Sequence, residues 1–167
     1  MTKNGNRILA AVVAAAVAFA AFAFWSARPA APEVTFVSLQ GEKITTASLR
    51  GKVVLVNFWA TDCVTCVKEM PDIVATHIKY RDRGFETIAV AMRHDPPNYV
   101  LNYAEKNKLP FKVALDPMGD LAKAFGEVKL TPTSFLIDKQ GNVVTRILGE
   151  PDFAKLHALL EEKLGET

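Results

Sequence analysis

The sequence predicts a single α/β domain in which helices flank a central mixed β-sheet. Three observations predict it. The segment from Val53 to Met92 has a strand–helix–strand pattern, which is typical of a parallel crossover unit. Ser134 to Leu148 has the pattern of a β-hairpin, and an amphipathic helix closes the chain. At 167 residues the chain is long enough for one such domain and hardly for two.

The elements before and within the crossover follow from local patterns. An extended stretch from Val34 to Phe36 and a turn at Gln40-Gly41 predict an N-terminal hairpin that covers one edge of the sheet. Val53 to Val56 is an unbroken apolar run, which indicates a central strand buried on both faces. A second buried strand is expected from Thr87 to Met92.

Between these strands a helix is expected to begin near Cys63 and to end at Arg83-Gly84. Pro71 lies inside it and should kink it, because proline has no N–H and crowds the carbonyl four residues back. An apolar stripe with spacings of three, four and four should face the sheet. The stripe consists of Val67, Met70, Val74 and Ile78.

The second half of the chain supplies three more helices, a short strand and the hairpin. Asp95 is predicted to cap a helix that Pro96-Pro97 opens. Its inner face should carry Val100, Leu101, Ala104 and Lys108. A short strand from Phe111 to Leu115 and a brief helix ending at Gly126 follow. The closing helix should bury Phe153, Leu156, Leu160 and Leu164.

The N-terminus predicts a membrane anchor. Residues 8–25 carry no polar side chain, and as a helix they would be about 27 Å long, close to the hydrocarbon thickness of a bilayer. Lys3 and Arg7 before this span favour a cytoplasmic N-terminus and a domain in the periplasm or outside the cell. A cleaved signal peptide is the alternative, with a formal cleavage site at Ala21-Phe22-Ala23. We expect residues 1–28 to be the anchor or signal peptide, 29–33 a linker and 34–167 the folded domain.

The net charge and the number of cysteines limit the classes of function that the sequence supports. The formal net charge is +2, but three basic residues lie before residue 29, so the expected domain is close to neutral and has no basic stripe for nucleic acid. The chain has two cysteines, Cys63 and Cys66. In an exported domain a single close pair indicates redox chemistry, whereas structural disulfides usually come in larger numbers.

The spacing of the pair gives each sulfur a role. Cys63 should sit at the start of the helix, where free N–H groups and the helix dipole favour a thiolate, so it should attack. Cys66 lies one turn on and can close the disulfide. A structural disulfide would close a very small loop, and zinc would need two more soft ligands, whereas the three histidines are scattered. No metal or cofactor is expected beyond the redox-active pair.

Two motifs together carry a family resemblance. Asn57-Phe58-Trp59-Ala60 precedes Cys63-Val64-Thr65-Cys66 and Lys68-Glu69-Met70-Pro71, and Leu130 to Asp138 supplies Leu-Thr-Pro-Thr-Ser-Phe-Leu-Ile-Asp. From about Val34 to Leu164 the sequence resembles the membrane-anchored TlpA/ResA-like group of thioredoxin-fold proteins. The resemblance implies a thioredoxin-like fold and an extracytoplasmic thiol–disulfide oxidoreductase. Several members reduce partner proteins during cytochrome c maturation or oxidase assembly, which implies disulfide-containing protein substrates and a membrane thiol-reductant donor.

The resemblance also implies roles for residues around the pair. Pro132 should follow a cis peptide bond, and Thr131-Pro132 should lie against the cysteines. Glu69 should lie near them, influence their titration and shuttle a proton, or else be a solvated charge on the helix surface. Asn57 stands where thioredoxins often have a buried aspartate, and an amide cannot ionise.

Three residues near the pair need separate interpretation. Asp62 stands where many relatives have an aromatic residue; its charge should oppose ionisation of Cys63, or its side chain should cap the helix. Trp59 either packs beneath the loop or contacts the substrate. His94 is expected in a solvent-exposed loop.

The leading hypothesis is therefore a periplasm-facing enzyme that reduces disulfides in partner proteins. Two alternatives remain open from the sequence. The same pair could donate disulfides as an oxidase or isomerase, since small changes in the motif alter the potential. A redox-gated binding module for an apocytochrome or metallochaperone is the alternative from a different class.

Overall fold

A computed structural model describes residues 12–13, 16 and 29–166. The anchor predicted over residues 8–25 lies outside the described residues except at 12–13 and 16, so the division into anchor, linker and domain stays a prediction. Within the described part of the chain, no helix combines the length and apolar character that crossing a bilayer requires.

The domain is built on a five-stranded mixed sheet with the order β5-β4-β3-β6-β7. The central position of β3 and its parallel pairing with β4 confirm the predicted crossover unit. β5 is parallel to β4, whereas β6 and β7 run antiparallel to their neighbours. The strands are β3 (Val53–Trp59), β4 (Phe85–Ala91), β5 (Lys112–Leu115), β6 (Thr133–Ile137) and β7 (Val143–Leu148).

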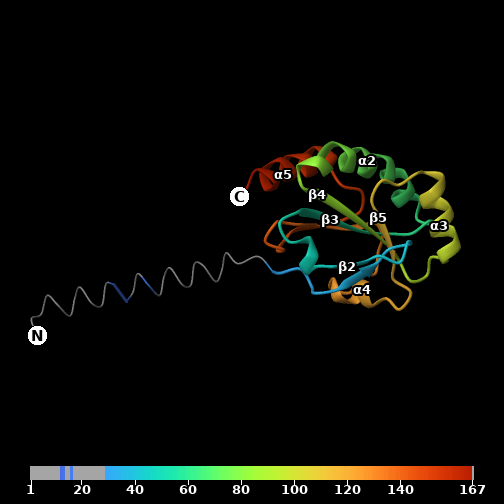
Figure 1. Cartoon of the computed structure of the whole chain (residues 1–167), viewed down its shortest axis with the longest axis horizontal. Helices are drawn as coiled ribbons and strands as arrows, with labels where there is room; N and C mark the ends of the chain where they lie inside the picture. Colours follow the sequence, from blue (N-terminus) through green and yellow to red (C-terminus); the bar gives the residue numbers. More distant parts are fainter. Residues whose placement is uncertain (1–11, 14–15, 17–28, 167) are drawn as a thin grey trace, which may run out of the picture.

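Both faces of the sheet are covered, and this confirms the predicted thioredoxin-like architecture (Figure 1). One face carries α2 (Val64–Tyr80), α3 (Pro97–Lys106) and α5 (Phe153–Gly165). The other carries α4 (Asp120–Ala124) and the hairpin of β1 (Thr35–Val37) and β2 (Lys43–Thr45). Two short 3-10 turns, Ala47–Leu49 and Arg81–Arg83, complete the elements.

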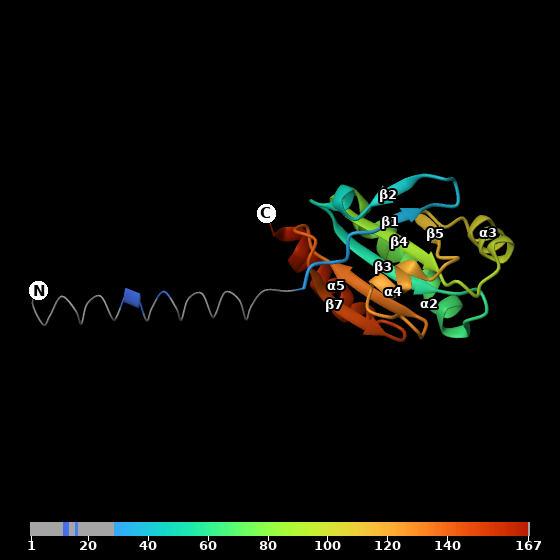
Figure 2. The same cartoon turned by 90° about the horizontal axis from the view of Figure 1, so that it is seen from below.

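The N-terminal hairpin lies beside β5, as predicted for an edge cover (Figure 2). Ser38 forms an antiparallel bridge with Ala114, and the Leu39 N–H donates to the Val113 carbonyl at 2.9 Å. These contacts occupy part of the outer side of β5, which would otherwise expose unpaired backbone groups.

Alternation along β3 divides the core between the two faces. Val54, Val56 and Phe58 join the cluster under α4 and the hairpin, whereas Leu55 and Trp59 join the cluster under α2, α3 and α5. Burying each such side chain stabilises the fold by about 1.5–3 kcal/mol. The same period places Asn57 on the α2 side of the sheet, between Leu55 and Trp59.

The predicted apolar stripe of α2 is half right: Met70 is buried and Val74 packs against the core, but Val67 and Ile78 face solvent. Val67 is 37% exposed and Ile78 51% exposed. The face that packs on the sheet is instead partly polar, because Glu69 and His77 find partners on Asn57 and Thr87. The buried residues of α2 are Cys66, Glu69, Met70, Ile73, Thr76, His77 and Tyr80.

The ends of α2 follow the prediction closely. Cys63 is the N-cap residue, and Pro71 lies inside the helix. After Tyr80 a 3-10 turn leads to Gly84, whose φ of 94° lies in the left-handed region that glycine adopts without a Cβ penalty.

The start of α3 differs from the prediction. Its N-cap is Pro96, and no side chain caps the helix. Asp95 is therefore not a helix cap, because its carboxylate is bonded to Thr61 instead. On the expected inner face Val100 is buried, but Leu101 is 40% exposed and Lys108 lies beyond the helix end.

Candidate active site

The cysteine pair lies where β3 gives way to α2. Cys63 and Cys66 are joined by a disulfide. Cys63 is partly exposed, whereas Cys66 is fully buried. The Cys66 N–H donates to Cys63 Sγ at 3.2 Å, so the free N–H of the first helical turn is directed at the outer sulfur. A partner molecule can reach Cys63, and the same N–H would stabilise its thiolate.

The turn before Cys63 is tied to the loop that follows β4. Thr61 donates its N–H to Asp95 Oδ2 and its hydroxyl to Asp95 Oδ1, both at 2.6 Å. Asp95 is only 5% exposed. The Cys63 N–H donates to the Ala60 carbonyl at 3.2 Å and closes the turn. Two loops that are 34 residues apart in sequence are thereby held together beside the disulfide.

Beneath the pair, a buried polar network joins three elements. Asn57 Nδ2 from β3 donates to Glu69 Oε1 from α2 at 3.0 Å and to Ser134 Oγ from β6 at 3.0 Å. All three residues are fully buried. Asn57 Oδ1 and Glu69 Oε2 have no hydrogen-bond partner among the described residues.

This environment perturbs Glu69. Burial raises its pKa from 4.5 to about 7; the hydrogen bond from Asn57 opposes the rise, and the nearby charge of Glu150 adds to it. The expectation that Glu69 is a solvated charge on the helix surface is therefore wrong, because the side chain points into the sheet. A carboxyl group with this pKa exchanges a proton readily at neutral pH.

Asp62 does not cap α2, which has Cys63 as its N-cap. Its side chain is 74% exposed, and Oδ1 lies 3.6 Å from Nε2 of His94. The His94 side chain is 51% exposed, as expected for a loop histidine. Of the two roles expected for Asp62, the electrostatic one remains: its charge should oppose ionisation of the adjacent Cys63, and a protonated His94 would partly neutralise that charge.

The segment before β6 reaches the same end of the sheet as the cysteines. Thr133, the first residue of β6, pairs with Phe58 near the end of β3. The Thr131-Pro132 peptide bond is cis, as the resemblance implies. Pro132 accepts a hydrogen bond from the Gly149 N–H at 2.9 Å, which joins this segment to the end of β7. Antiparallel register therefore places Thr131 and Pro132 at the end of β3 that leads to Cys63.

Trp59 is fully buried, and its ring packs against Tyr103 with 5.1 Å between the centroids. Its burial favours the packing interpretation over contact with the substrate. The ring supports the site from below, where α3 covers the end of β3.

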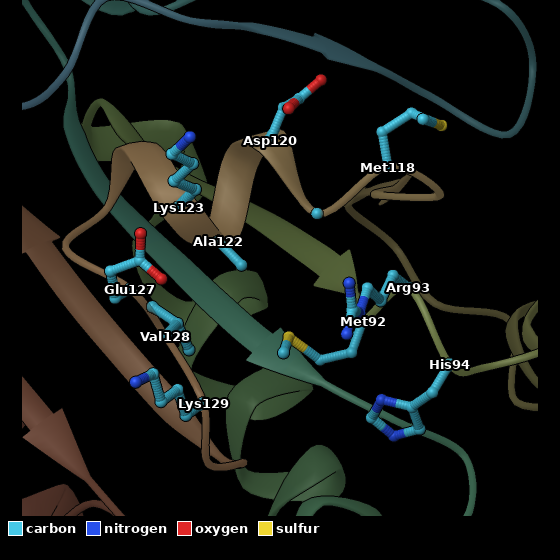
Figure 3. A pocket seen from close by; sticks show the side chains of 11 residues that line it. Met92, Arg93, His94, Met118, Asp120, Ala122, Lys123, Glu127, Val128 and Lys129 are labelled. Atoms are coloured by element: carbon cyan, nitrogen blue, oxygen red, sulfur yellow. The ribbon is translucent and has the colours of Figure 1, made fainter.

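A groove adjoins the site on the α4 side (Figure 3). We call it the β4–α4 groove; its volume is about 620 Å³. Ala122 and Val128 are buried in its wall, and three cations surround it. These are Arg93, Lys123 and Lys129, none of which forms an ion pair within the described part of the chain. Its lining comes from residues 92–94, 118–120, 122–123 and 127–129. One wall reaches His94 beside Asp62, and the other leads into Thr131-Pro132.

The site combines an accessible sulfur at a helix N-terminus with a buried partner sulfur and a buried carboxyl group beneath them. On a sheet of this topology, that combination defines a thioredoxin-fold thiol–disulfide oxidoreductase. Comparison with known proteins agrees with that class. The Redoxin family matches residues 26–160, and the chain belongs to this family.

Named relatives have the same chemistry. The chain is 39% identical over 132 residues to the thiol-disulfide oxidoreductase ResA of Bacillus thuringiensis subsp. konkukian, covering 79% of this chain and 75% of that protein. With ResA of Geobacillus thermodenitrificans the identity is 36% over 119 residues, or 71% and 67% of the two chains. A thioredoxin-family thiol:disulfide interchange protein from Chlorobium tepidum TLS matches with a TM-score of 0.76 and 32% identity, over 84% and 99% of the chains. The protein is a thiol–disulfide oxidoreductase.

Sequence reasoning missed two residues of this site. The sequence pattern predicts Ser134 only as a strand residue, yet it completes the network with Asn57. Asp95 was assigned to α3, yet it holds Thr61. Their positions in the sequence could have indicated a role in the site, since both lie next to strand ends that meet at the cysteines. Within the described residues, no group of three or more acidic, histidine or cysteine side chains could hold a metal ion.

Proposed function

We propose that this oxidoreductase reduces disulfides in partner proteins outside the cytoplasm, with Cys63 as the attacking thiol and Cys66 as the resolving thiol. The observation that supports this order most directly is the difference in exposure between the two sulfurs. A folded protein partner can reach Cys63 at the surface, whereas Cys66 is fully buried behind it.

In the proposed reaction the Cys63 thiolate attacks one sulfur of the substrate disulfide. The substrate S–S bond breaks, a mixed disulfide forms, and the leaving thiolate takes up a proton. Cys66 then loses its proton and attacks Cys63, which releases the second substrate thiolate. The substrate gains two electrons and two protons, and the enzyme ends as the Cys63–Cys66 disulfide. A membrane thiol-reductant donor would restore the dithiol.

Glu69 is proposed as the group that handles the Cys66 proton. Its pKa of about 7 suits transfer in either direction near neutral pH. Asn57 holds the carboxyl group by a hydrogen bond and cannot itself titrate. Thr131 and Pro132 are proposed to support the bound substrate, since they lie at the same end of the sheet.

The β4–α4 groove supports a polypeptide substrate. It adjoins the site along both walls. Its buried apolar lining, and its cations that form no ion pair among the described residues, offer contacts to residues that flank a target disulfide. We propose a domain anchored in the inner membrane through residues 8–25 and facing the periplasm, or released there if the segment is cleaved. The resemblance to the TlpA/ResA-like group supports a role in cytochrome c maturation or oxidase assembly.

Trapping tests the proposed order of the thiols. A Cys66→Ala variant cannot resolve the intermediate, so it should accumulate disulfide-linked partner proteins in cells. A Cys63→Ala variant is the matched control and should accumulate few. Accumulation on Cys63→Ala instead, or none on Cys66→Ala while Cys63 reacts with an alkylating reagent, would contradict the assignment. The trapped proteins would also identify the substrates.

Two further measurements test whether the protein reduces or donates disulfides, and whether it is an enzyme or a binding module. Equilibration with glutathione should give a potential near that of thioredoxin, about −270 mV, whereas a value near −120 mV would make the protein a disulfide donor. A Cys63→Ser, Cys66→Ser double variant should lose its biological activity. Full activity in that variant would instead favour the redox-gated binding module.

A further inference from the structure

We propose that Asp95 is a positioning residue that holds the turn before Cys63 in its reactive geometry by accepting both hydrogen bonds of Thr61. This inference rests on the proposed role of Cys63 as the attacking thiol. Asp95 lies in the loop after β4, its side-chain hydrogen bonds among the described residues go to Thr61, and it would act on Cys63 only through Thr61.

The first support is the geometry of the contact. Both oxygens of the carboxylate are used, one by the Thr61 N–H and one by its hydroxyl, and both distances are 2.6 Å. Hydrogen bonds to an ionised acceptor are shorter and roughly twice as strong as neutral ones. A bidentate contact of this kind fixes the backbone and the side chain of Thr61 together.

The second support is that Asp95 does not have the local function that its sequence position suggests. An aspartate just before Pro-Pro at a helix start usually caps the helix, but α3 begins without a side-chain cap. The residue is nevertheless only 5% exposed. Burial of a carboxylate is costly unless its oxygens are bonded, and Thr61 supplies both bonds.

The third support is the short path from Thr61 to the reacting sulfur. Cys63 is two residues on, and its N–H closes the same turn on Ala60 at 3.2 Å. Because Cys63 is the N-cap of α2, the position of its Sγ depends on the direction in which the chain enters the helix. That direction sets whether Sγ meets the Cys66 N–H, a contact of 3.2 Å. Releasing Thr61 would let the turn move and weaken this contact.

A simple electrostatic role for Asp95 predicts the opposite sign. A carboxylate that only added negative charge near Cys63 would disfavour its thiolate, so neutralising it would lower the pKa of the thiol and speed attack below that pKa. Positioning predicts a higher pKa of the Cys63 thiol and slower attack below that pKa, because a looser turn weakens the Cys66 N–H contact that stabilises the thiolate. Rates measured across pH separate the two.

The test uses the full-length reduced protein and measures the rate at which Cys63 reacts with iodoacetamide between pH 5 and 10. Asp95→Asn and Thr61→Val should each raise the pH midpoint of the rate by about one unit, which lowers the rate below the wild-type midpoint about tenfold. The Asp95→Asn, Thr61→Val double variant should be no slower than either single one, because the two residues form one interaction. Thr61→Ser keeps both donors and should restore a rate close to that of the wild type.

Asp116→Asn is the matched control. Asp116 is 4% exposed and also accepts two hydrogen bonds, from the N–H groups of Leu121 and Ala122 at 3.1 and 2.8 Å, but these lie in α4. It should lose stability and keep a rate below the midpoint within about twofold of the wild type. If Asp95→Asn fails to fold, Thr61→Val still decides the question.

Rates below the midpoint within twofold of the wild type, for Asp95→Asn or Thr61→Val, would overturn the proposal, and so would additive losses in the double variant. The proposed thiol order would fail differently. Peptide mapping of the wild type would then find the first alkyl group on Cys66 and not on Cys63.

Discussion

Replacing Glu69 by glutamine should remove a large pH-dependent term from the stability of the oxidised protein. The folded state holds the Glu69 proton with a pKa of about 7, compared with 4.5 for an unperturbed group. Below pH 4.5 both states are protonated, and the stabilisation is fully present. As pH rises through the window from 4.5 to about 7, the unfolded state loses its proton first, so stability falls.

The size of the effect follows from the shift. At about 1.4 kcal/mol per pKa unit, this rise corresponds to about 3 kcal/mol of unfolding free energy lost across the window. Glutamine is neutral in both states and keeps an oxygen for the Asn57 amide. Glu69→Gln should therefore be more stable than the wild type at pH 8, by up to that amount, and show little advantage at pH 4.5.

The assay is urea unfolding of the oxidised protein at half-unit steps from pH 4.5 to 8. Burial lowers the pKa of His77 and His157, which makes stability rise with pH. The informative quantity is therefore the difference between variant and wild type at each pH. Glu105→Gln, at an exposed site on α3, is the control and should follow the wild type. A difference that stays constant with pH would refute the reasoning.

Three further predictions concern the core, the first thiol and the groove. Leu160→Ala removes a fully buried side chain of α5 and should lower the unfolding free energy by about 2–5 kcal/mol in denaturant titrations; a loss below 1 kcal/mol would contradict the packing. Asp62→Asn should lower the pKa of Cys63, seen as thiolate absorbance at 240 nm appearing at lower pH, whereas an unchanged titration would show that Asp62 is screened. Arg93→Glu with Lys129→Glu should reduce kcat/KM several-fold more for a disulfide peptide with acidic flanks than for one with basic flanks, and equal losses would argue against the groove.

The sheet and its connections could be predicted because their signals are local. The run Val53–Val56 is apolar without interruption, which only a strand buried on both faces explains well. The hairpin turn and the closing helix likewise depend on residues close in sequence. The cysteine pair was identified for the same reason, since its spacing and its place between strand and helix are visible in a short window.

The buried face of α2 could be predicted only in part from apolar periodicity. That analysis assumes that polar side chains turn outward, but Glu69 and His77 turn inward toward partners on neighbouring strands. Asp95 shows the same limit. The local pattern predicts that Asp95 caps α3, but its carboxylate instead accepts hydrogen bonds from Thr61, 34 positions earlier in the chain. In each case a tertiary hydrogen bond outweighs the local preference.

The amide at position 57 explains why the titrating group beneath the cysteines is Glu69. The Asn57 side-chain amide donates one hydrogen bond to Glu69 and one to Ser134. Ionised Glu69 would thus receive a single hydrogen bond in the described structure, on Oε1, and Oε2 would carry its charge without a donor. Leaving a charged oxygen unbonded in the interior costs more than leaving a neutral hydroxyl unbonded. The protonated form is therefore favoured up to about neutral pH, which keeps a proton available one helical turn from Cys66.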